Sequence, residues 1–122
     1  MTITDEGIRI EIEIPELADR RNVERKECYL MLYDRYMQYK GVNDYDKLSE
    51  DTGIWESVRA NFRWTRFRSD LTDVDMYYDN AESMWSICIE WKGVTGPFCV
   101  YYKDPKEAVR VYIQLSDYMI SR

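Results

Sequence analysis

The chain has 122 residues, of which 45% are hydrophobic and 33% are charged, so it suits one globular domain spanning residues 1–122. Acidic residues outnumber basic ones by 23 to 17, and the resulting net charge of −6 disfavours binding to nucleic acid or anionic lipid through a cationic surface. Histidine is absent, which excludes Ser–His and Cys–His catalytic pairs and imidazole metal sites.

The first half of the chain predicts a strand followed by a long helix. Isoleucines alternate with charged residues over residues 8–14, which is typical of a half-buried strand. Pro15 ends that strand and suits the first turn of a helix, which we expect over residues 16–40 and which Gly41 would end. Residues 41–53 are polar and acidic and predict a loop, and residues 54–62 have helical spacing. The segment RWTRFRS, residues 63–69, favours a strand.

The second half predicts three strands and a final helix. The strands are expected over residues 71–78, 83–92 and 98–102, with the turn GVTGP between the last two. A helix begins strongly at Asp104, where Asp caps, Pro105 takes the first position and Glu107 completes a capping box. We therefore expect an α+β fold: an antiparallel meander sheet of about four to five strands, with a long N-terminal helix and a C-terminal helix packed on one face.

Three cysteines, Cys28, Cys88 and Cys99, form no framework pattern, and we expect all three to be reduced. Cys88 and Cys99 fall on neighbouring predicted strands, so a pair between them is the alternative. The first residues lack the basic start and apolar centre of a signal peptide, and no apolar run reaches the length of a membrane helix. These features together indicate a cytoplasmic protein with no membrane association.

A basic and aromatic stretch at residues 59–68 is the first candidate for function. Arginines that hold phosphates and rings that stack on bases are the combination used by single-strand nucleic-acid binders. The residues that would serve are Arg63, Trp64, Arg66, Phe67 and Arg68. The alternative is a hairpin in which the acids of residues 70–82 neutralise these arginines. The net negative charge makes direct nucleic-acid binding the weaker hypothesis.

A second candidate is a metal-dependent nuclease. Asp73 or Asp75, with Glu90 and Lys92 on a neighbouring strand, would supply carboxylates for Mg²⁺ and a lysine for the attacking water or the transition state. Such a triplet arises often by chance in charged proteins, and a surface salt bridge is the simpler interpretation.

The third candidate is a surface that combines carboxylates with tyrosines. Tyrosine anchors protein interfaces, and with carboxylates it binds an arginine-rich partner through cation–π contacts and charge pairing. The expected partner-binding residues are Glu11, Glu13, Asp44, Tyr45, Asp46, Asp73, Asp75, Tyr77, Tyr78 and Asp79.

The third candidate is the one we favour. It predicts a non-enzymatic interaction module with no catalytic residue, no metal and no cofactor, which binds and blocks a basic, nucleic-acid-handling protein. Small acidic inhibitors of this physical type occur among phage anti-defence proteins, including CRISPR inhibitors, and among toxin-immunity proteins; the analogy is one of size and charge. An exposed tyrosine face would serve a homodimer equally well.

Overall fold

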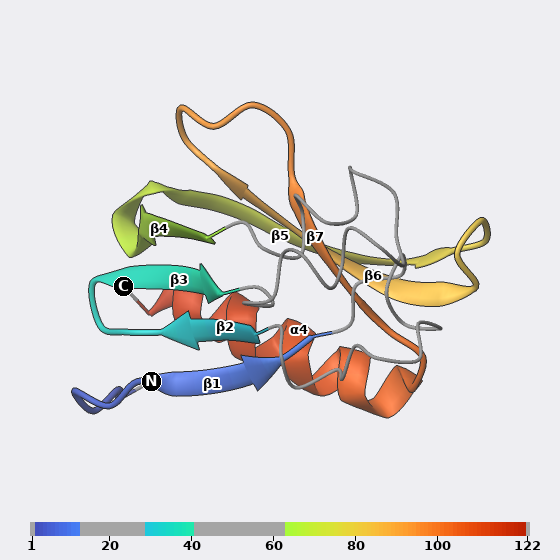
Figure 1. The fold of residues 1–122 in the computed structure, drawn as a ribbon, viewed down its shortest axis with the longest axis horizontal. Helices are drawn as coiled ribbons and strands as arrows, with labels where there is room; N and C mark the ends of the chain where they lie inside the picture. Colours follow the sequence, from blue (N-terminus) through green and yellow to red (C-terminus); the bar gives the residue numbers. More distant parts are fainter. Residues whose placement is uncertain (1, 13–28, 41–62, 122) are drawn as a thin grey trace, which may run out of the picture.

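The computed structural model describes residues 2–12, 29–40 and 63–121, which form two antiparallel sheets and one α-helix (Figure 1). The elements in chain order are β1 (Ile8–Glu11), β2 (Tyr29–Leu32), β3 (Tyr36–Lys40), β4 (Arg63–Phe67), the 3-10 turn η2 (Arg68–Asp70), β5 (Leu71–Asp79), β6 (Met84–Trp91), β7 (Phe98–Tyr102) and α4 (Pro105–Ile120). Within these ranges no helix is both long enough and apolar enough to cross a bilayer.

Sheet A contains β1 to β4 in chain order, each strand antiparallel to the next. Its inner face carries the buried side chains Ile10, Leu30 and Tyr39, which lie side by side across three strands because Ile10 pairs with Leu30 and Leu30 with Tyr39. Its outer face carries polar, basic and aromatic residues. This alternation fixes the register, since a shift by one residue would exchange the two faces.

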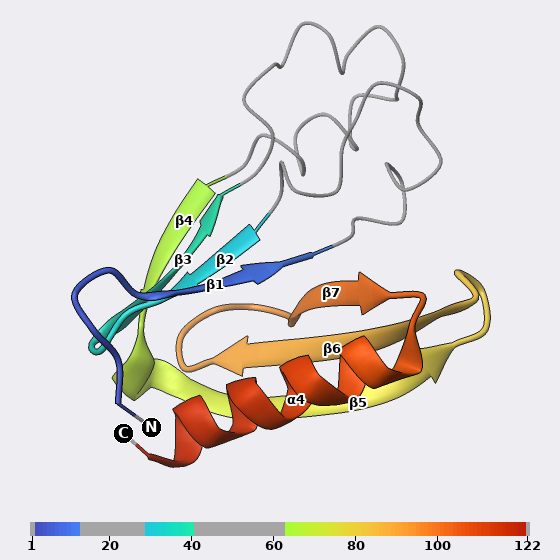
Figure 2. The ribbon, with the colours of Figure 1, turned by 90° about the horizontal axis from the view of Figure 1, so that it is seen from below.

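Sheet B contains β5, β6 and β7, also in chain order. Ile87 and Ile89 of β6 and Val100 of β7 point into the core, and none of the three has measurable exposure. The 3-10 turn η2 connects β4 to β5 and carries the chain from one sheet to the other. Figure 2 shows sheet A rising at an angle from sheet B, with α4 running along sheet B.

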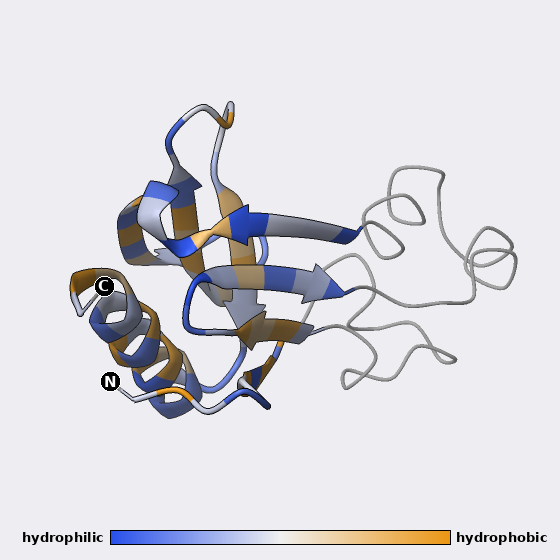
Figure 3. Ribbon diagram, turned by 90° about the vertical axis from the view of Figure 1, so that its left-hand side faces the viewer, coloured by the Kyte–Doolittle hydropathy of each residue, from blue (hydrophilic) through white to orange (hydrophobic). Residues whose placement is uncertain are grey.

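Helix α4 is amphipathic and covers sheet B with one face. Asp104 caps it by accepting a hydrogen bond from Lys106 N at 3.0 Å, and Pro105 occupies its first turn, as the sequence predicts. The buried residues recur at helical spacing and are Ala108, Val111, Leu115 and Tyr118. Hydrophobic and hydrophilic bands alternate along the helix in Figure 3. Both sheets and α4 thus share one hydrophobic core.

Two buried tyrosines hold the layers together by hydrogen bonds to backbone. The Tyr118 hydroxyl contacts Tyr33 O at 2.7 Å and Tyr36 O at 3.0 Å, so the end of α4 is fixed to the turn between β2 and β3. The Tyr102 hydroxyl donates to Glu11 O at 2.8 Å and links β7 to β1. Burial raises the pKa of Tyr118 to about 12, because the tyrosinate would lose its hydration.

The expected single sheet with a long N-terminal helix is wrong. The second half of the predicted helix over 16–40 forms β2 and β3 instead, joined by a turn at residues 33–35. The remainder of that prediction, residues 16–28, and the predicted elements over 41–62 lie outside the described residues. In the described ranges α4 is the only α-helix, and the strands divide into two sheets rather than one meander.

The other elements are confirmed with small changes in their bounds. These are the first strand, the strand beginning at Arg63, the three strands of sheet B and the C-terminal helix. The hairpin considered as an alternative, in which the acids of residues 70–82 pair with the arginine stretch, does not form, since β4 pairs with β3 and β5 pairs with β6. The described part of that stretch therefore faces none of those acids across a strand pair.

Candidate functional site

The outer face of sheet B gathers acidic side chains from β5. Leu71 and Val74 point into the core, and an irregularity in the register between Leu71 and Asp73 places Asp73 on the opposite face. Regular alternation then puts Asp75, Tyr77 and Asp79 on the same face as Asp73. Tyr77 has 47% of its surface exposed.

Strand β6 adds a further carboxylate to this face. Glu90 is exposed and lies directly opposite Asp73 in the strand pair. Strands β5, β6 and β7 contain four acidic residues and neither lysine nor arginine, so the strand positions of this face carry only negative charge. We call this surface the acidic face and define it by Asp73, Asp75, Tyr77, Asp79 and Glu90.

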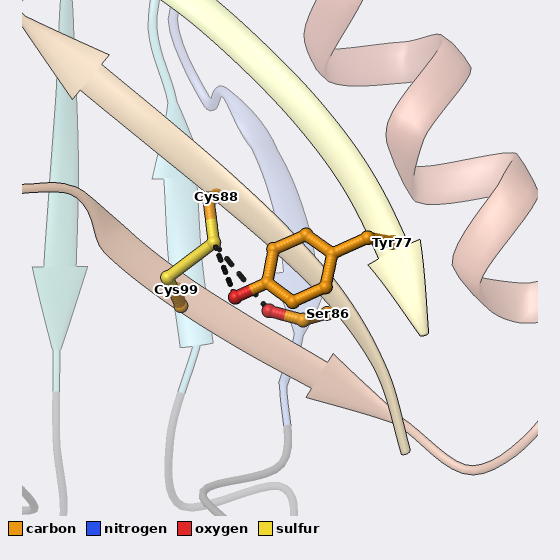
Figure 4. The surroundings of a disulfide bond; sticks show 4 residues. All are labelled: Tyr77, Ser86, Cys88 and Cys99. Atoms are coloured by element: carbon orange, nitrogen blue, oxygen red, sulfur yellow. Dashed lines mark hydrogen bonds between the residues drawn. A yellow bond between two sulfur atoms is a disulfide. The ribbon is translucent and has the colours of Figure 1, made fainter. Parts of the chain in front are cut away.

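A disulfide lies beside Tyr77 on the same side of the sheet. Cys88 of β6 is directly opposite Cys99 of β7, and the two are bonded (Figure 4). The Tyr77 hydroxyl lies 3.6 Å from Cys88 Sγ, and the Ser86 hydroxyl lies 3.5 Å from the same atom. A bonded sulfur has no hydrogen to donate, so the two hydroxyls are the donors. The disulfide links β6 to β7, and the Tyr77 hydroxyl on β5 contacts one of its sulfur atoms.

The expectation of three reduced cysteines is therefore wrong for Cys88 and Cys99, and Cys28 lies outside the described residues. The register of the β6–β7 hairpin decides the matter, because it places the two side chains on one face with no residue between them. The cytoplasmic expectation rested in part on reduced thiols and loses that part of its support, since disulfides persist mainly in oxidising compartments.

The predicted partner-binding residues fall into four groups. Asp73, Asp75, Tyr77 and Asp79 lie together on the acidic face. Tyr78 lies on the other side of β5, where its ring packs edge-to-face against Trp85 with centroids 5.2 Å apart.

Glu11 lies on sheet A, away from the acidic face. Its carboxylate accepts a bond of 2.6 Å from Arg9 Nε, and the Arg9 guanidinium covers the Tyr29 ring at 3.7 Å. Glu11 is therefore neutralised locally. The last group, Glu13, Asp44, Tyr45 and Asp46, lies outside the described residues.

Asp79 has a structural role at the edge of the acidic face. Its Oδ1 accepts hydrogen bonds from Ala81 N at 3.0 Å and Glu82 N at 3.1 Å, which closes the turn between β5 and β6. Ser83 completes that turn with a positive φ of 54°. Among the described residues, none donates a hydrogen bond to the carboxylates of Asp73, Asp75 or Glu90, which makes these three the stronger candidates for contact with a partner.

The proposed nuclease set is only partly brought together. Asp73 and Glu90 are directly opposite, but Lys92 follows the end of β6, and its backbone N–H donates to Asp70 O at 2.7 Å. Across residues 2–12, 29–40 and 63–121, no three Asp, Glu or Cys side chains are grouped so that they could hold a metal ion. The described residues thus give the nuclease hypothesis no ligand set.

The arginine and aromatic stretch does not form one surface. Arg63 and Phe67 lie on the outer face of sheet A, whereas Trp64 and Arg66 lie on its inner face.

Arg68 is only 5% exposed, and backbone and hydroxyl oxygens surround its guanidinium, with the Asp34 carboxylate 3.6 Å away. It donates to Tyr118 O at 2.8 Å, Asp34 O at 3.0 Å and Ser121 Oγ at 2.8 Å. Arg68 therefore joins η2 to the end of α4 and is not available to a ligand.

Sequence reasoning did not foresee a cationic outer face on sheet A. Lys40 is directly opposite Arg63 there, and residues of β3 and β4, these two among them, line a shallow cavity of about 280 Å³. Sheet A carries four basic residues, of which Arg9, Lys40 and Arg63 lie on this outer face, and one acidic residue, in contrast to sheet B. The pairing of β3 with β4 brings Lys40 and Arg63 together. Because the sequence predicts a helix over residues 16–40, this pairing is not expected from the sequence.

Comparison with known proteins finds no protein-family model and no curated protein that matches this chain. The geometry of the described residues is therefore what a functional conclusion rests on.

Proposed function

We propose that the protein is a non-enzymatic interaction module that binds a basic protein through the acidic face of sheet B. The observation that carries the proposal is the cross-strand pair of Asp73 and Glu90, with Asp75 two residues further along β5 on the same face. Like charges directly opposite each other destabilise a sheet. No lysine or arginine within β5 to β7 relieves this repulsion, and a cationic partner would.

The chemistry of the acidic face fits arginine-rich surfaces in particular. Asp73 and Asp75 are two residues apart on β5 and point to the same side of the sheet. Their positions are therefore about 7 Å apart, and the two carboxylates form a line of negative charge. The exposed Tyr77 ring adds a surface for cation–π contact with a guanidinium. A protein that binds nucleic acid offers such an arginine-rich surface, and occupying it would block access of the nucleic acid. An inhibitor of a nucleic-acid-handling protein is therefore the function that this face supports best.

The opposite charges of the two sheets support the same proposal. Sheet A has an excess of three basic residues over acidic ones, and sheet B has four acidic residues alone. A basic partner is attracted to sheet B and repelled by sheet A, so it approaches in one orientation. Steering of this kind raises association rates and weakens with salt.

The test uses the double substitution Asp73→Asn/Asp75→Asn, which removes charge and keeps shape. The tagged wild type and variant are used to capture proteins from nuclease-treated lysate at low salt, and each captured protein is then titrated with both forms by calorimetry. We expect the wild type to bind a basic partner with an affinity that falls with salt, and the variant to bind it at least tenfold more weakly. We also expect the variant to be more stable by about 0.5 kcal/mol, because it loses repulsion.

The matched control is Asp5→Asn/Glu6→Gln, which removes the same charge from the exposed turn that precedes β1. The control should bind like the wild type. Equal binding by Asp73→Asn/Asp75→Asn and the wild type would contradict the proposal, and so would an affinity that does not change with salt.

A second candidate is binding of single-stranded nucleic acid on the outer face of sheet A. The cavity beside Lys40 and Arg63 supports it, together with Phe67, which is 64% exposed on the same face. Fluorescence anisotropy of a labelled oligonucleotide tests it. Binding that Arg63→Glu abolishes and Asp73→Asn/Asp75→Asn leaves intact would favour this candidate over the first.

A further inference from the structure

Within the part of the chain that the structure describes, three buried hydrogen-bond donors at the boundary of the two sheets have no acceptor. They are Nε1 of Trp64, Nη1 of Arg66 and Nε1 of Trp91. Trp91 is only 3% exposed, so water reaches its ring edge poorly. A buried donor without a partner costs about 1–3 kcal/mol, and more when the group is charged.

The three side chains form one cluster. The Arg66 guanidinium carbon lies 4.1 Å from the centre of the Trp64 ring and 4.5 Å from the centre of the Trp91 ring. The two indoles pack edge-to-face, with centroids 5.0 Å apart and planes at 72°. Phe98 closes one side of the cluster against Trp64, with centroids 5.2 Å apart. We call Trp64, Arg66 and Trp91 the Trp–Arg cluster.

The cluster lies between the edge strand of sheet A and the end of β6. Trp64 and Arg66 are on the inner face of β4, at positions of intermediate exposure. Trp91 pairs with Leu71 on the core side of sheet B, so the cluster is separate from the acidic face.

All three polar groups of the cluster are hydrogen-bond donors. An indole N–H and a guanidinium are donors only, and neither can accept a hydrogen bond from the other. Burial lowers the pKa of Arg66 through loss of hydration. Through the ranges of the chain that the structure describes, no carboxylate forms an ion pair with Arg66. One group with several acceptor atoms and a negative charge would satisfy all three donors.

We propose that the Trp–Arg cluster is a binding site for an oxyanion, namely a carboxylate or a phosphate. The guanidinium supplies the charge and a planar pair of donors that matches two oxygens of such a group. The indole N–H groups of Trp64 and Trp91 supply further donors, and the aromatic walls exclude water, which strengthens each bond.

The experiment follows the indole N–H signals of the ¹⁵N-labelled protein in a two-dimensional NMR spectrum. The chain has four tryptophans, and the variants Trp64→Phe, Trp85→Phe and Trp91→Phe assign the signals needed. Sodium acetate and sodium phosphate are added in separate titrations, with sodium chloride at the same ionic strength as the reference. We expect the indole protons of Trp64 and Trp91 to move downfield together and to saturate, while Trp85 stays in place. The salt that saturates at the lower concentration tells whether the ligand is a carboxylate or a phosphate.

Two arginines on opposite faces of β4 provide the variant and its control. Arg66→Met should weaken binding of the anion at least tenfold, measured as the salt concentration that gives half of the maximal shift. Arg66→Lys keeps the charge but loses the planar pair of donors, and it should weaken binding less. Arg63→Met should leave it unchanged. The proposal is overturned if neither salt moves Trp64 and Trp91 beyond the chloride reference, if Trp85 moves equally, or if Arg63→Met abolishes the shift.

Discussion

The guanidinium of Arg68 lies 4.2 Å above the ring of Tyr118, and its Nε donates to the carbonyl oxygen of the same residue at 2.8 Å. A residue at the corner between the two sheets thus binds both the ring and the backbone of the last turn of α4. Backbone and hydroxyl oxygens surround this buried guanidinium, and the Asp34 carboxylate lies 3.6 Å from its Nη1.

Replacing Arg68 with methionine should destabilise the protein by about 3 kcal/mol. The change leaves three oxygen acceptors without their donor and removes the contact with the Tyr118 ring, whereas the methionine chain fills most of the space. Urea denaturation followed by tryptophan fluorescence measures the loss. Arg63→Met is the control, because Arg63 is exposed on the same segment, and a loss of similar size there would contradict the structural role of Arg68.

Stability at alkaline pH should fall because of Tyr118. In the unfolded chain its pKa is near the ordinary value of 10.0, and in the folded protein burial raises it to about 12. The folded state therefore disfavours the ionised form. Its contribution is complete below pH 10 and is lost progressively as the pH rises from 10 to 12.

Denaturation of the wild type and Tyr118→Phe on both sides of pH 10 isolates this effect. At neutral pH the variant should be less stable by about 1 kcal/mol, since it loses the hydroxyl contacts with Tyr33 O and Tyr36 O. At alkaline pH the difference should shrink. A difference that stays constant across this range would show that Tyr118 does not titrate with folding.

Removing the disulfide should lower the free energy of unfolding by about 3 kcal/mol, because Cys88 and Cys99 close a loop with a sequence separation of 11. The variant Cys88→Ser/Cys99→Ser and the wild type with added reductant should show similar denaturation midpoints. Reductant should have no further effect on the variant. A wild type that is indifferent to reductant would contradict a stabilising role for the bond.

Two glycines with nearly the same backbone conformation should respond differently to alanine. Gly7 has φ of 76°, and a Cβ there would lie 2.8 Å from the Tyr33 ring and 2.9 Å from Leu32 O. Gly96 has φ of 78° but open space around it. Gly96→Ala should cost about 1 kcal/mol from backbone strain alone, and Gly7→Ala should cost clearly more. Thermal unfolding measures both, and equal losses would show that the contact at Gly7 relaxes freely.

The strands of sheet B and helix α4 could be predicted because their signals are local. Alternation is visible along β5 and β6, and Asp104 with Pro105 marks a helix start by its own chemistry. Placing Asp73, Asp75, Tyr77 and Asp79 on one face follows from the same alternation. Their proximity to Glu90 depends on the pairing of β5 with β6, which the sequence only suggests.

Strands β2 and β3 could not be predicted by alternation, because their outer faces carry large apolar residues as well. Tyr29, Met31 and Tyr36 sit opposite the buried side chains, so the segment looks apolar on every side. Leucine and methionine also favour helices, and no glycine or proline marks the turn at residues 33–35. The separation into two sheets depends on the corner at η2, where Arg68 is held by groups distant in the sequence.

Strand β5 is the longest strand described, and it forms an edge of its sheet, where backbone groups can pair with another chain. Asp73, Asp75 and Asp79 are spaced along it. A second molecule that added its own β5 to this edge would bring the two rows of aspartates together, and the repulsion would oppose the pairing. These aspartates should therefore also protect the protein from fibrillar aggregation, and a variant that lacks their charge should be stored at lower concentration.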